Sequence, residues 1–188
     1  MGHKYSIISV MGLLILGATS LTAYFSWHPK TPRSIQSSQQ ADAVMENVSA
    51  IIMDKQGKPS MKIVSPKMIH FAANDTTQLV EPELTLYRKS PKPWYIRAKH
   101  GQATAGIDKV NFWDNVTIHH AADENNPVTF IKTPTLTVHP DKQIALTKDL
   151  ITLIQPNLIV KATGMYADMN TGDIKLISQA RGEYVPNS

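Results

Sequence analysis

The segment FWDNVTI, residues 112–118, shows the alternation that is typical of a β-strand. Alternate residues place Phe112, Val116 and Ile118 on one face and Trp113 on the other. One face is therefore predicted to lie on a core. Two interpretations remain for Trp113: its ring covers a hairpin edge or a loop, or it belongs to a surface that contacts another protein.

The same pattern returns along the chain as a repeat. Each unit reads as one strand, a turn and a longer strand that bends. The four units run from IVSPKMIHF to ELTLY (63–87), from IRAKHGQAT to NVTIH (96–119), from IKTPTLTVH to LITLI (131–154) and from VKATGMYAD to GEYV (160–185). A further strand, Val48–Met53, precedes them. A unit of this size cannot bury its own apolar face, so the units are predicted to stack.

Turn-forming residues interrupt the pattern where a hairpin needs them. They are Asn74 and Asp75, Gly106 and Asp108, Pro140 and Asp141, and the run from Asn170 to Asp173. No helical periodicity appears after residue 44. The chain is therefore predicted to be all-β, with nine or more strands arranged as stacked antiparallel hairpins.

The composition of the chain excludes several classes of function. The chain has 188 residues, of which 42% are hydrophobic, which suffices for one domain and an additional segment. It has no cysteine, which excludes disulfides, thiolate metal sites and a cysteine nucleophile. The net charge of +4 comes from dispersed basic residues, and no nucleic-acid binding is predicted.

The N-terminal region contains an uncharged apolar segment, residues 5–27, that is long enough to cross a bilayer as a helix. Tyr24, Phe25 and Trp27 form an aromatic belt at its far end. We expect a single transmembrane helix with residues 1–4 as a cytoplasmic head. A cleaved signal peptide is the alternative.

Residues 28–43 are polar and lack periodicity, which predicts a linker between the membrane and the domain of residues 44–188.

No motif of catalysis or of metal binding stands out. His119 and His120 are adjacent, so on a strand they point to opposite faces. The other histidines are isolated from ligand-forming neighbours in the sequence. The chain has no HExxH, GxSxG or P-loop sequence. We therefore expect no enzyme, no cofactor and no metal site.

The order of these elements resembles the LptC family, the membrane-anchored component of lipopolysaccharide export. The segments that carry the likeness are DKQG (54–57), VEPELTLYR (80–88), PWYIRAKHGQAT (93–104), KDLITLI (148–154) and IVKATGMYADMNTGDIKLIS (159–178). The resemblance implies a twisted, open β-jellyroll in the periplasm, tethered to the inner membrane by a single helix.

The resemblance also implies a relay function. Acyl chains of lipopolysaccharide would lie between the two sheets. The N-terminal edge would dock on the transporter proteins LptF and LptG, and the C-terminal edge would pair with the bridge protein LptA. The membrane helix would pack against the transporter, whose ATPase is LptB.

The residues assigned to these roles follow from the strand alternation. The lipid-lining set is Val48, Ile69, Phe71, Leu79, Ile96, Phe112, Val116, Leu136, Leu146, Ile174 and Leu176. The C-terminal edge is represented by Ile174, Leu176, Ser178 and Tyr184, and the N-terminal edge by Val48 and Ile51. One bulge would invert the face of a strand. The alternative interpretations are that these side chains form a closed core, and that the domain is a protein scaffold that binds no lipid.

Overall fold

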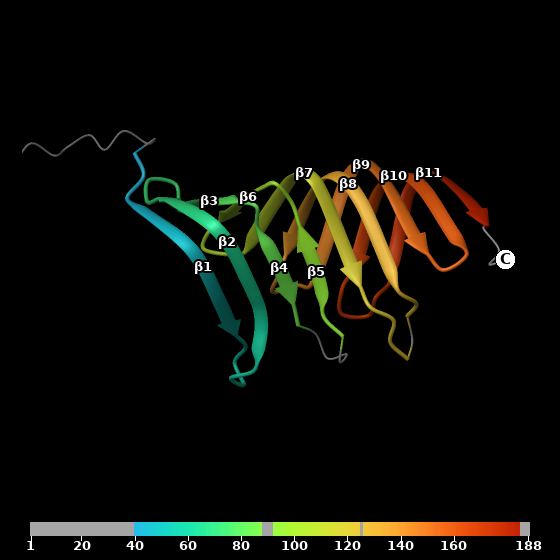
Figure 1. Cartoon of the computed structure of the whole chain (residues 1–188), viewed down its shortest axis with the longest axis horizontal. Coiled ribbons are helices and arrows are strands. Elements are labelled where there is room, and N and C mark those ends of the chain that lie inside the picture. Colours follow the sequence, from blue (N-terminus) through green and yellow to red (C-terminus); the bar gives the residue numbers. More distant parts are fainter. Residues whose placement is uncertain (1–39, 88–91, 125, 185–188) are drawn as a thin grey trace, which may run out of the picture. The chain divides into compact units, whose positions relative to one another are not determined.

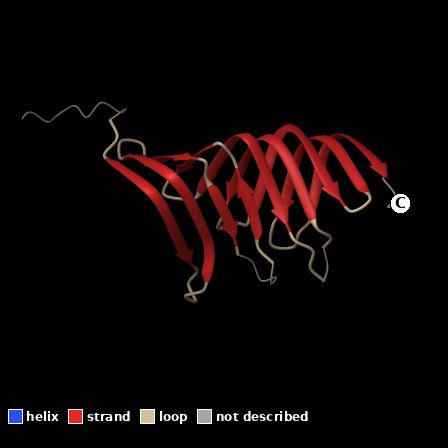
Figure 2. Cartoon of the chain, viewed as in Figure 1, coloured by secondary structure: helices blue, strands red, loops and turns tan. Residues whose placement is uncertain are grey.

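The structure, a computed structural model, describes residues 40–87, 92–124 and 126–184. The expected transmembrane segment and most of the expected linker lie outside these residues. Every regular element in the described part of the chain is a strand, as Figure 2 shows. Among the same residues, no helix is long and apolar enough to cross a membrane.

Eleven strands form one antiparallel sheet. They are β1 (Ala43–Met53), β2 (Pro59–Phe71), β3 (Thr76–Val80), β4 (Glu83–Leu86), β5 (Trp94–Arg97), β6 (His100–Thr104), β7 (Lys109–His120), β8 (Thr129–His139), β9 (Ile144–Gln155), β10 (Leu158–Asp168) and β11 (Ile174–Tyr184). The prediction of an all-β fold built from antiparallel hairpins is confirmed.

The strands follow one another in space in nearly the order of the sequence (Figure 1). β3 pairs with β6 and β4 with β5, so that β3–β4 and β5–β6 each act as one interrupted strand. β2 pairs with both β3 and β4, and β7 pairs with both β5 and β6. Within the described residues β1 pairs only with β2 and β11 only with β10, so the sheet does not close on itself.

The predicted turns lie between the strands as expected, but two details of the predicted strands were wrong. β1 begins at Ala43, earlier than the predicted start at Val48. The first two units are also interrupted, because the chain leaves the ladder at Glu81–Pro82 and again at Ala98–Lys99. Proline lacks the N–H that a ladder needs, which explains the first interruption.

The interruptions belong to a line of bends that crosses the whole sheet, which we call the crease. Its residues are Asn47, Pro66, Glu81–Pro82, Ala98–Lys99, Asp114–Asn115, Pro134, Lys148–Asp149, Gly164 and Gln179. The crease divides the sheet into two layers, visible in Figure 1 as crossing strands. We call them the β3/β6 layer and the β4/β5 layer, each with the adjoining halves of the long strands.

A short motif produces the bend in two of the long strands. The Ser65 hydroxyl donates to the carbonyl of Lys67 at 2.8 Å, and the Thr133 hydroxyl donates to the carbonyl of Thr135 at 3.1 Å. A proline lies between donor and acceptor in both cases. The side-chain hydroxyl thus donates a hydrogen bond to a backbone carbonyl at a point where the proline, which has no N–H, cannot continue the ladder.

The crease also changes which residues face inward. In β2 the inward set runs through Met61, Ile63 and Ser65 and resumes at Met68, so the parity changes. In β7 three residues separate the inward Phe112 and Val116, so the parity is kept. The ladder between β7 and β8 accordingly shifts by one residue at this point.

Candidate functional site

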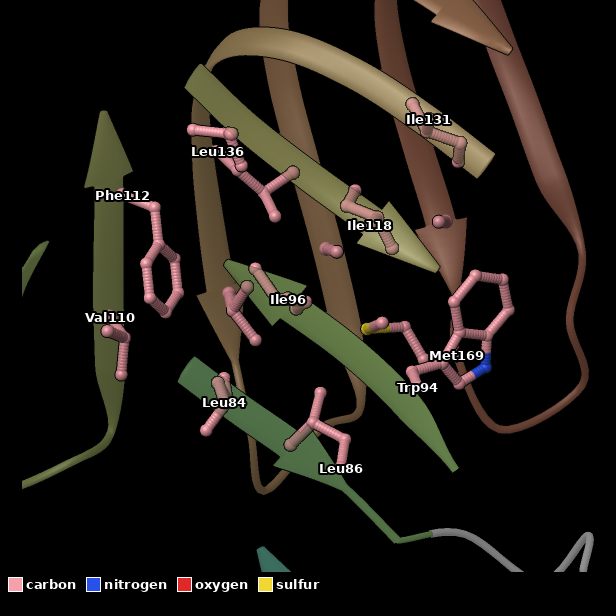
Figure 3. Close-up of a cluster of buried hydrophobic side chains, with 14 of the residues drawn as sticks. Leu84, Leu86, Trp94, Ile96, Val110, Phe112, Ile118, Ile131, Leu136 and Met169 are labelled. Carbon is pink, nitrogen blue, oxygen red and sulfur yellow. The ribbon is translucent and has the colours of Figure 1, made fainter. Parts of the chain in front are cut away.

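The space between the two layers holds the hydrophobic core. Figure 3 shows Leu84 of β4, Ile96 of β5, Phe112 of β7 and Leu136 of β8 among its side chains. Ile96 is completely buried and Phe112 is 1% exposed. The centre of the roll is therefore filled by its own side chains.

Five of the eleven residues predicted to line the interior are buried in this core. They are Leu79, Ile96, Phe112, Val116 and Leu136. Three more are partly buried and pack against the core at the two ends of the sheet, Val48 on β1 and Ile174 and Leu176 on β11. The structure thus brings eight of the predicted residues to the inner face.

The inward orientation predicted for Ile69, Phe71 and Leu146 is wrong. On β2 the parity changes at Pro66, so the buried residue is Met68 and its neighbour Ile69 points to the other face. Phe71 shares the parity of Ile69, and both are partly exposed.

The inward orientation predicted for Leu146 is wrong for a different reason. The residue at the equivalent position of the other units is a large apolar side chain, whereas in the third unit that position is Thr147. Thr147 is 4% exposed, and Leu146 beside it lies on the opposite face. The repeat therefore persists in register, but a threonine fills the inward position.

Four methionines of the core were not predicted from the sequence. They are Met61, Met68, Met165 and Met169, all at most 6% exposed. The signal for Met68 and Met165 is their position just after a bend, where the inward parity changes. Flexible thioether side chains fill irregular gaps between the packed strands.

The two layers meet again along their hairpin turns, on the side opposite the crease. The side-chain amide of Gln143 donates to the carbonyl of Tyr87 at 3.0 Å, which joins a turn of one layer to the end of β4 in the other. Gly172 lies against the Asn126 side chain, so close that an added Cβ would be 2.5 Å from its oxygen. We call this line of contacts the seam.

A buried polar cluster lies behind the seam. The His120 ring is fully buried and lies 4.6 Å from the Trp94 ring, measured between centroids. Its Nε2 is 3.5 Å from a carboxylate oxygen of Asp123. Asp123 also accepts from the backbone and side-chain nitrogens of Asn126, at 2.8 and 3.1 Å. The cluster holds the loop after β7 in the shape that places Asn126 on Gly172.

The histidine pair behaves as its spacing predicted. His120 points into the core, whereas His119 lies on the outer face between Tyr95 and Phe130. Among the residues that the structure describes, no three His, Asp or Glu side chains gather as a metal site.

A second histidine anchors the start of β1. His70 Nδ1 lies 2.8 Å from the Asp42 carboxylate, and its Nε2 lies 3.5 Å from Asp75. The hydrogen bond with Asp42 is the main cause that raises the pKa of His70 above its ordinary value near 6.5. The Asp42 carboxylate also accepts from the Ala72 backbone at 3.0 Å, so the cluster ties β1 to the turn after β2.

The predicted edge residues lie on the terminal strands. Ile51 of β1 is 52% exposed and Tyr184 of β11 is 71% exposed. Ser178 donates its hydroxyl to the Thr163 carbonyl of β10 at 3.1 Å, so it braces β11 from the side of the sheet. Within the described residues, the outer backbone edge of each terminal strand has no neighbouring strand.

Fold and site together define a class of protein: an open β-roll with an apolar interior and two free edge strands. Residues 11–185 match the family described as lipopolysaccharide-assembly, LptC-related, and the chain belongs to this family. Proteins of this family are components of lipopolysaccharide transport.

The chain was also compared with solved structures and with curated protein sequences. The crystal structure of LptH, the LptA homologous periplasmic component of the lipopolysaccharide transport device from Pseudomonas aeruginosa, is 9% identical in sequence. It covers 77% of this chain and 94% of its own, with a TM-score of 0.47. No curated protein sequence matches the chain.

Proposed function

We propose that the chain is a membrane-anchored periplasmic carrier that takes lipopolysaccharide from an inner-membrane ABC transporter and passes it to a periplasmic bridge protein. The observation that carries the proposal is the family match, which extends from residue 11, inside the apolar segment, to residue 185 at the end of the roll. Residues 5–27 would form the single membrane helix, with residues 1–4 in the cytoplasm and residues 28–43 as the linker.

The interior supports the binding of acyl chains. Each buried methylene contributes about 0.8 kcal/mol, without strong polar contacts that would slow release. The partly buried Val48 at one end and Ile174 and Leu176 at the other give a lipid chain apolar surface on entering and leaving. Because the centre is filled, an acyl chain takes the place of core contacts, and the layers part along the seam.

The two free edges support the transfer between partners. An unpaired edge strand adds the strand of a partner through backbone hydrogen bonds. The β1 edge, with Val48 and Ile51, is assigned to LptF and LptG. The β11 edge, with Ile174, Leu176, Ser178 and Tyr184, is assigned to LptA. The membrane helix would pack against the transporter and influence the ATPase LptB.

Site-specific photocrosslinking tests the interior. A photoreactive phenylalanine at position 112 or 176 is expected to yield adducts with lipopolysaccharide in cells, because Phe112 and Leu176 face the inner side. The matched controls are Asn111 and Lys175, the neighbours that point outward on the same strands, and they are expected to yield none.

A second function is favoured by the filled centre of the roll. A domain whose core is already complete could act only as a scaffold that joins membrane and periplasmic proteins. Lipid adducts at the inward positions would exclude this function. If positions 112 and 176 yield protein adducts only, the scaffold replaces the carrier.

A further inference from the structure

The outer face of the β4/β5 layer carries a row of cations that runs across the strands next to the crease. Directly paired residues of an antiparallel sheet share a face, so the ladder defines the row. From β4 to β11 it consists of Glu83, Arg97, Thr117, Lys132, Thr152, Lys161 and Arg181. Adjacent strands are about 4.8 Å apart, so the cations from Arg97 to Lys161 recur roughly every 10 Å.

A second row lies beside the first, one step nearer the hairpin turns. It consists of Tyr95, His119, Phe130, Ile154 and Ile159, in the order of the strands, and ends at Glu183 on β11. The Tyr95 and His119 rings are stacked at 6.0 Å between centroids, and those of His119 and Phe130 at 4.3 Å. A continuous aromatic surface therefore runs parallel to the basic row.

A hollow joins the two rows. It has a volume of about 460 Å³ and is lined by Tyr95, Arg97, Thr117, His119 and Phe130. Tyr95 and Phe130 are 43% and 45% exposed, so part of each ring that does not stack on His119 is open to a ligand. The hollow thus offers flat apolar walls with a cation at one side.

Cations outnumber carboxylates in these two rows, with Arg97, Lys132, Lys161 and Arg181 against Glu83 and Glu183. Arg97 is paired with Glu83 at 3.0 Å. In the described part of the chain, no carboxylate lies within ion-pair distance of Lys132, Lys161 or Arg181. The outer face of the β3/β6 layer differs, since its central row is neutral: Gln78, Gln102, Asn111 and Thr137.

We infer that the outer face of the β4/β5 layer binds a phosphorylated saccharide. The polarised C–H groups of a sugar ring suit the negative faces of Tyr95 and Phe130. Lys132 is two residues beyond Phe130 on the same face, about 7 Å along the strand. Its ammonium group would bind a phosphate carried by the sugar that stacks on Phe130. Arg97 lies beside the hollow as a second donor to phosphate oxygens.

A membrane surface suits this face less well than a saccharide. Side chains that enter a bilayer interface protrude from the protein, whereas these rings line a hollow that a flat surface would leave empty. The site lies on the opposite side of the sheet from the core, so it does not depend on lipid binding in the interior.

The test measures binding of glucosamine 6-phosphate to the full chain in a neutral detergent, by saturation-transfer nuclear magnetic resonance. We expect Phe130→Ala and Lys132→Gln each to weaken binding at least tenfold. Both residues are exposed, so the fold is kept. The matched controls are Tyr166→Ala and Lys175→Gln, a ring and a cation paired on the outer face of the other layer, which leave binding unchanged.

Three results would overturn the inference. Equal weakening by the two control variants would mean that the binding is not localised to this face. Displacement of the probe by inorganic phosphate at the same concentration, with no contribution from the sugar, would indicate a nonspecific anion site. Binding of nanodiscs of anionic lipid through Phe130 and Lys132, without binding of the sugar phosphate, would assign the face to a membrane surface.

Discussion

At the scale of single residues, Gly164 shows how the crease constrains the sequence. Its φ of +76° lies in the left-handed region that side chains with a Cβ adopt only with strain. An added Cβ would also lie 2.9 Å from the Ile177 side chain on β11. Glycine is therefore required here both by the backbone and by the close packing of the last two strands.

Gly164→Ala is expected to lower the free energy of unfolding by about 2–4 kcal/mol, the sum of backbone strain and the clash with Ile177. Gly106→Ala is the matched control, because Gly106 has a φ of +66° but open space around it. Gly106→Ala should lower the free energy of unfolding by only about 1–2 kcal/mol, because it adds backbone strain without a clash. Denaturant unfolding measures both. Equal effects of the two substitutions would show that the contact with Ile177 is unimportant.

His70 gives the domain a pH dependence whose sign follows from its pKa. Since the pKa is raised in the folded state by the hydrogen bond with Asp42, the stabilisation is fully present below pH 6.5. It is lost as the pH rises through the folded-state value. A nuclear magnetic resonance titration of the His70 ring checks this directly.

Asp42→Asn should bring the pKa of His70 back towards 6.5, because the neutral amide no longer favours the imidazolium. In the chain without this substitution, the backbone amides at the start of β1 should lose protection from hydrogen exchange at alkaline pH, where His70 is neutral. A titration of His70 that does not change in Asp42→Asn would remove the assigned cause.

At the scale of elements, β11 contributes little to the core. Only Ile174 and Leu176 of this strand pack against it, and the residues after Leu176 are exposed. A terminal strand of this kind is suited to pairing with another protein, because its removal leaves the core nearly complete.

Deletion of residues 174–188 is expected to abolish capture of the bridge protein while the domain still unfolds cooperatively. The loss in stability should be about 3 kcal/mol or less, from two partly buried side chains. Pull-down with LptA and thermal unfolding give the two measurements. Tyr166→Ala, on the outer face of the neighbouring strand, serves as the control with intact capture. Undiminished capture by the deletion variant would reject the β11 edge as the binding surface.

At the scale of the whole molecule, the crease and the seam give the two layers different freedom to move. Covalent strands cross the crease, whereas the seam shows the Gln143 hydrogen bond to Tyr87 and the packing of Asn126 on Gly172. Parting of the layers along the seam would therefore open the interior without breaking a strand.

The absence of cysteine allows a direct test of this opening. In Tyr87→Cys/Gln143→Cys, a short thiol-specific cross-linker joins the layers across the seam. We expect the cross-linked protein to give fewer lipopolysaccharide adducts at position 112, because the layers can no longer part. The same variant without the cross-linker is the control. Equal adduct yields before and after cross-linking would show that lipid enters elsewhere, for example at the ends of the sheet.

Much of the fold could be predicted from the sequence, and two of the three errors in side-chain orientation, at Ile69 and Phe71, follow a bend. Alternation placed Phe112 and Val116 correctly, because the three residues between them at the crease preserve parity. It misplaced Ile69, because the bend at Pro66, which has no partner in the ladder, shifts the parity by one. The repeated Ser-Pro and Thr-Pro pairs mark these positions in the sequence, although their hydrogen bonds become evident only in the structure.

The outer face was the part of the molecule least accessible from sequence. Arg97, Lys132, Lys161 and Arg181 are far apart along the chain and do not form a cluster in it. Strand register places them in one row, and register depends on the single-residue shifts at the crease. Cations that are dispersed in the sequence thus lie in one row on one face of the fold.

The sequence by itself determined the all-β class, the hairpin order and the apolar inner face, because alternation and turn residues act locally. Only the tertiary structure decided that the interior is filled, where the layers meet at the seam, and which residues face each side beyond each bend. These depend on contacts between residues distant in the chain, and a shift of one residue at a bend reverses every side chain after it.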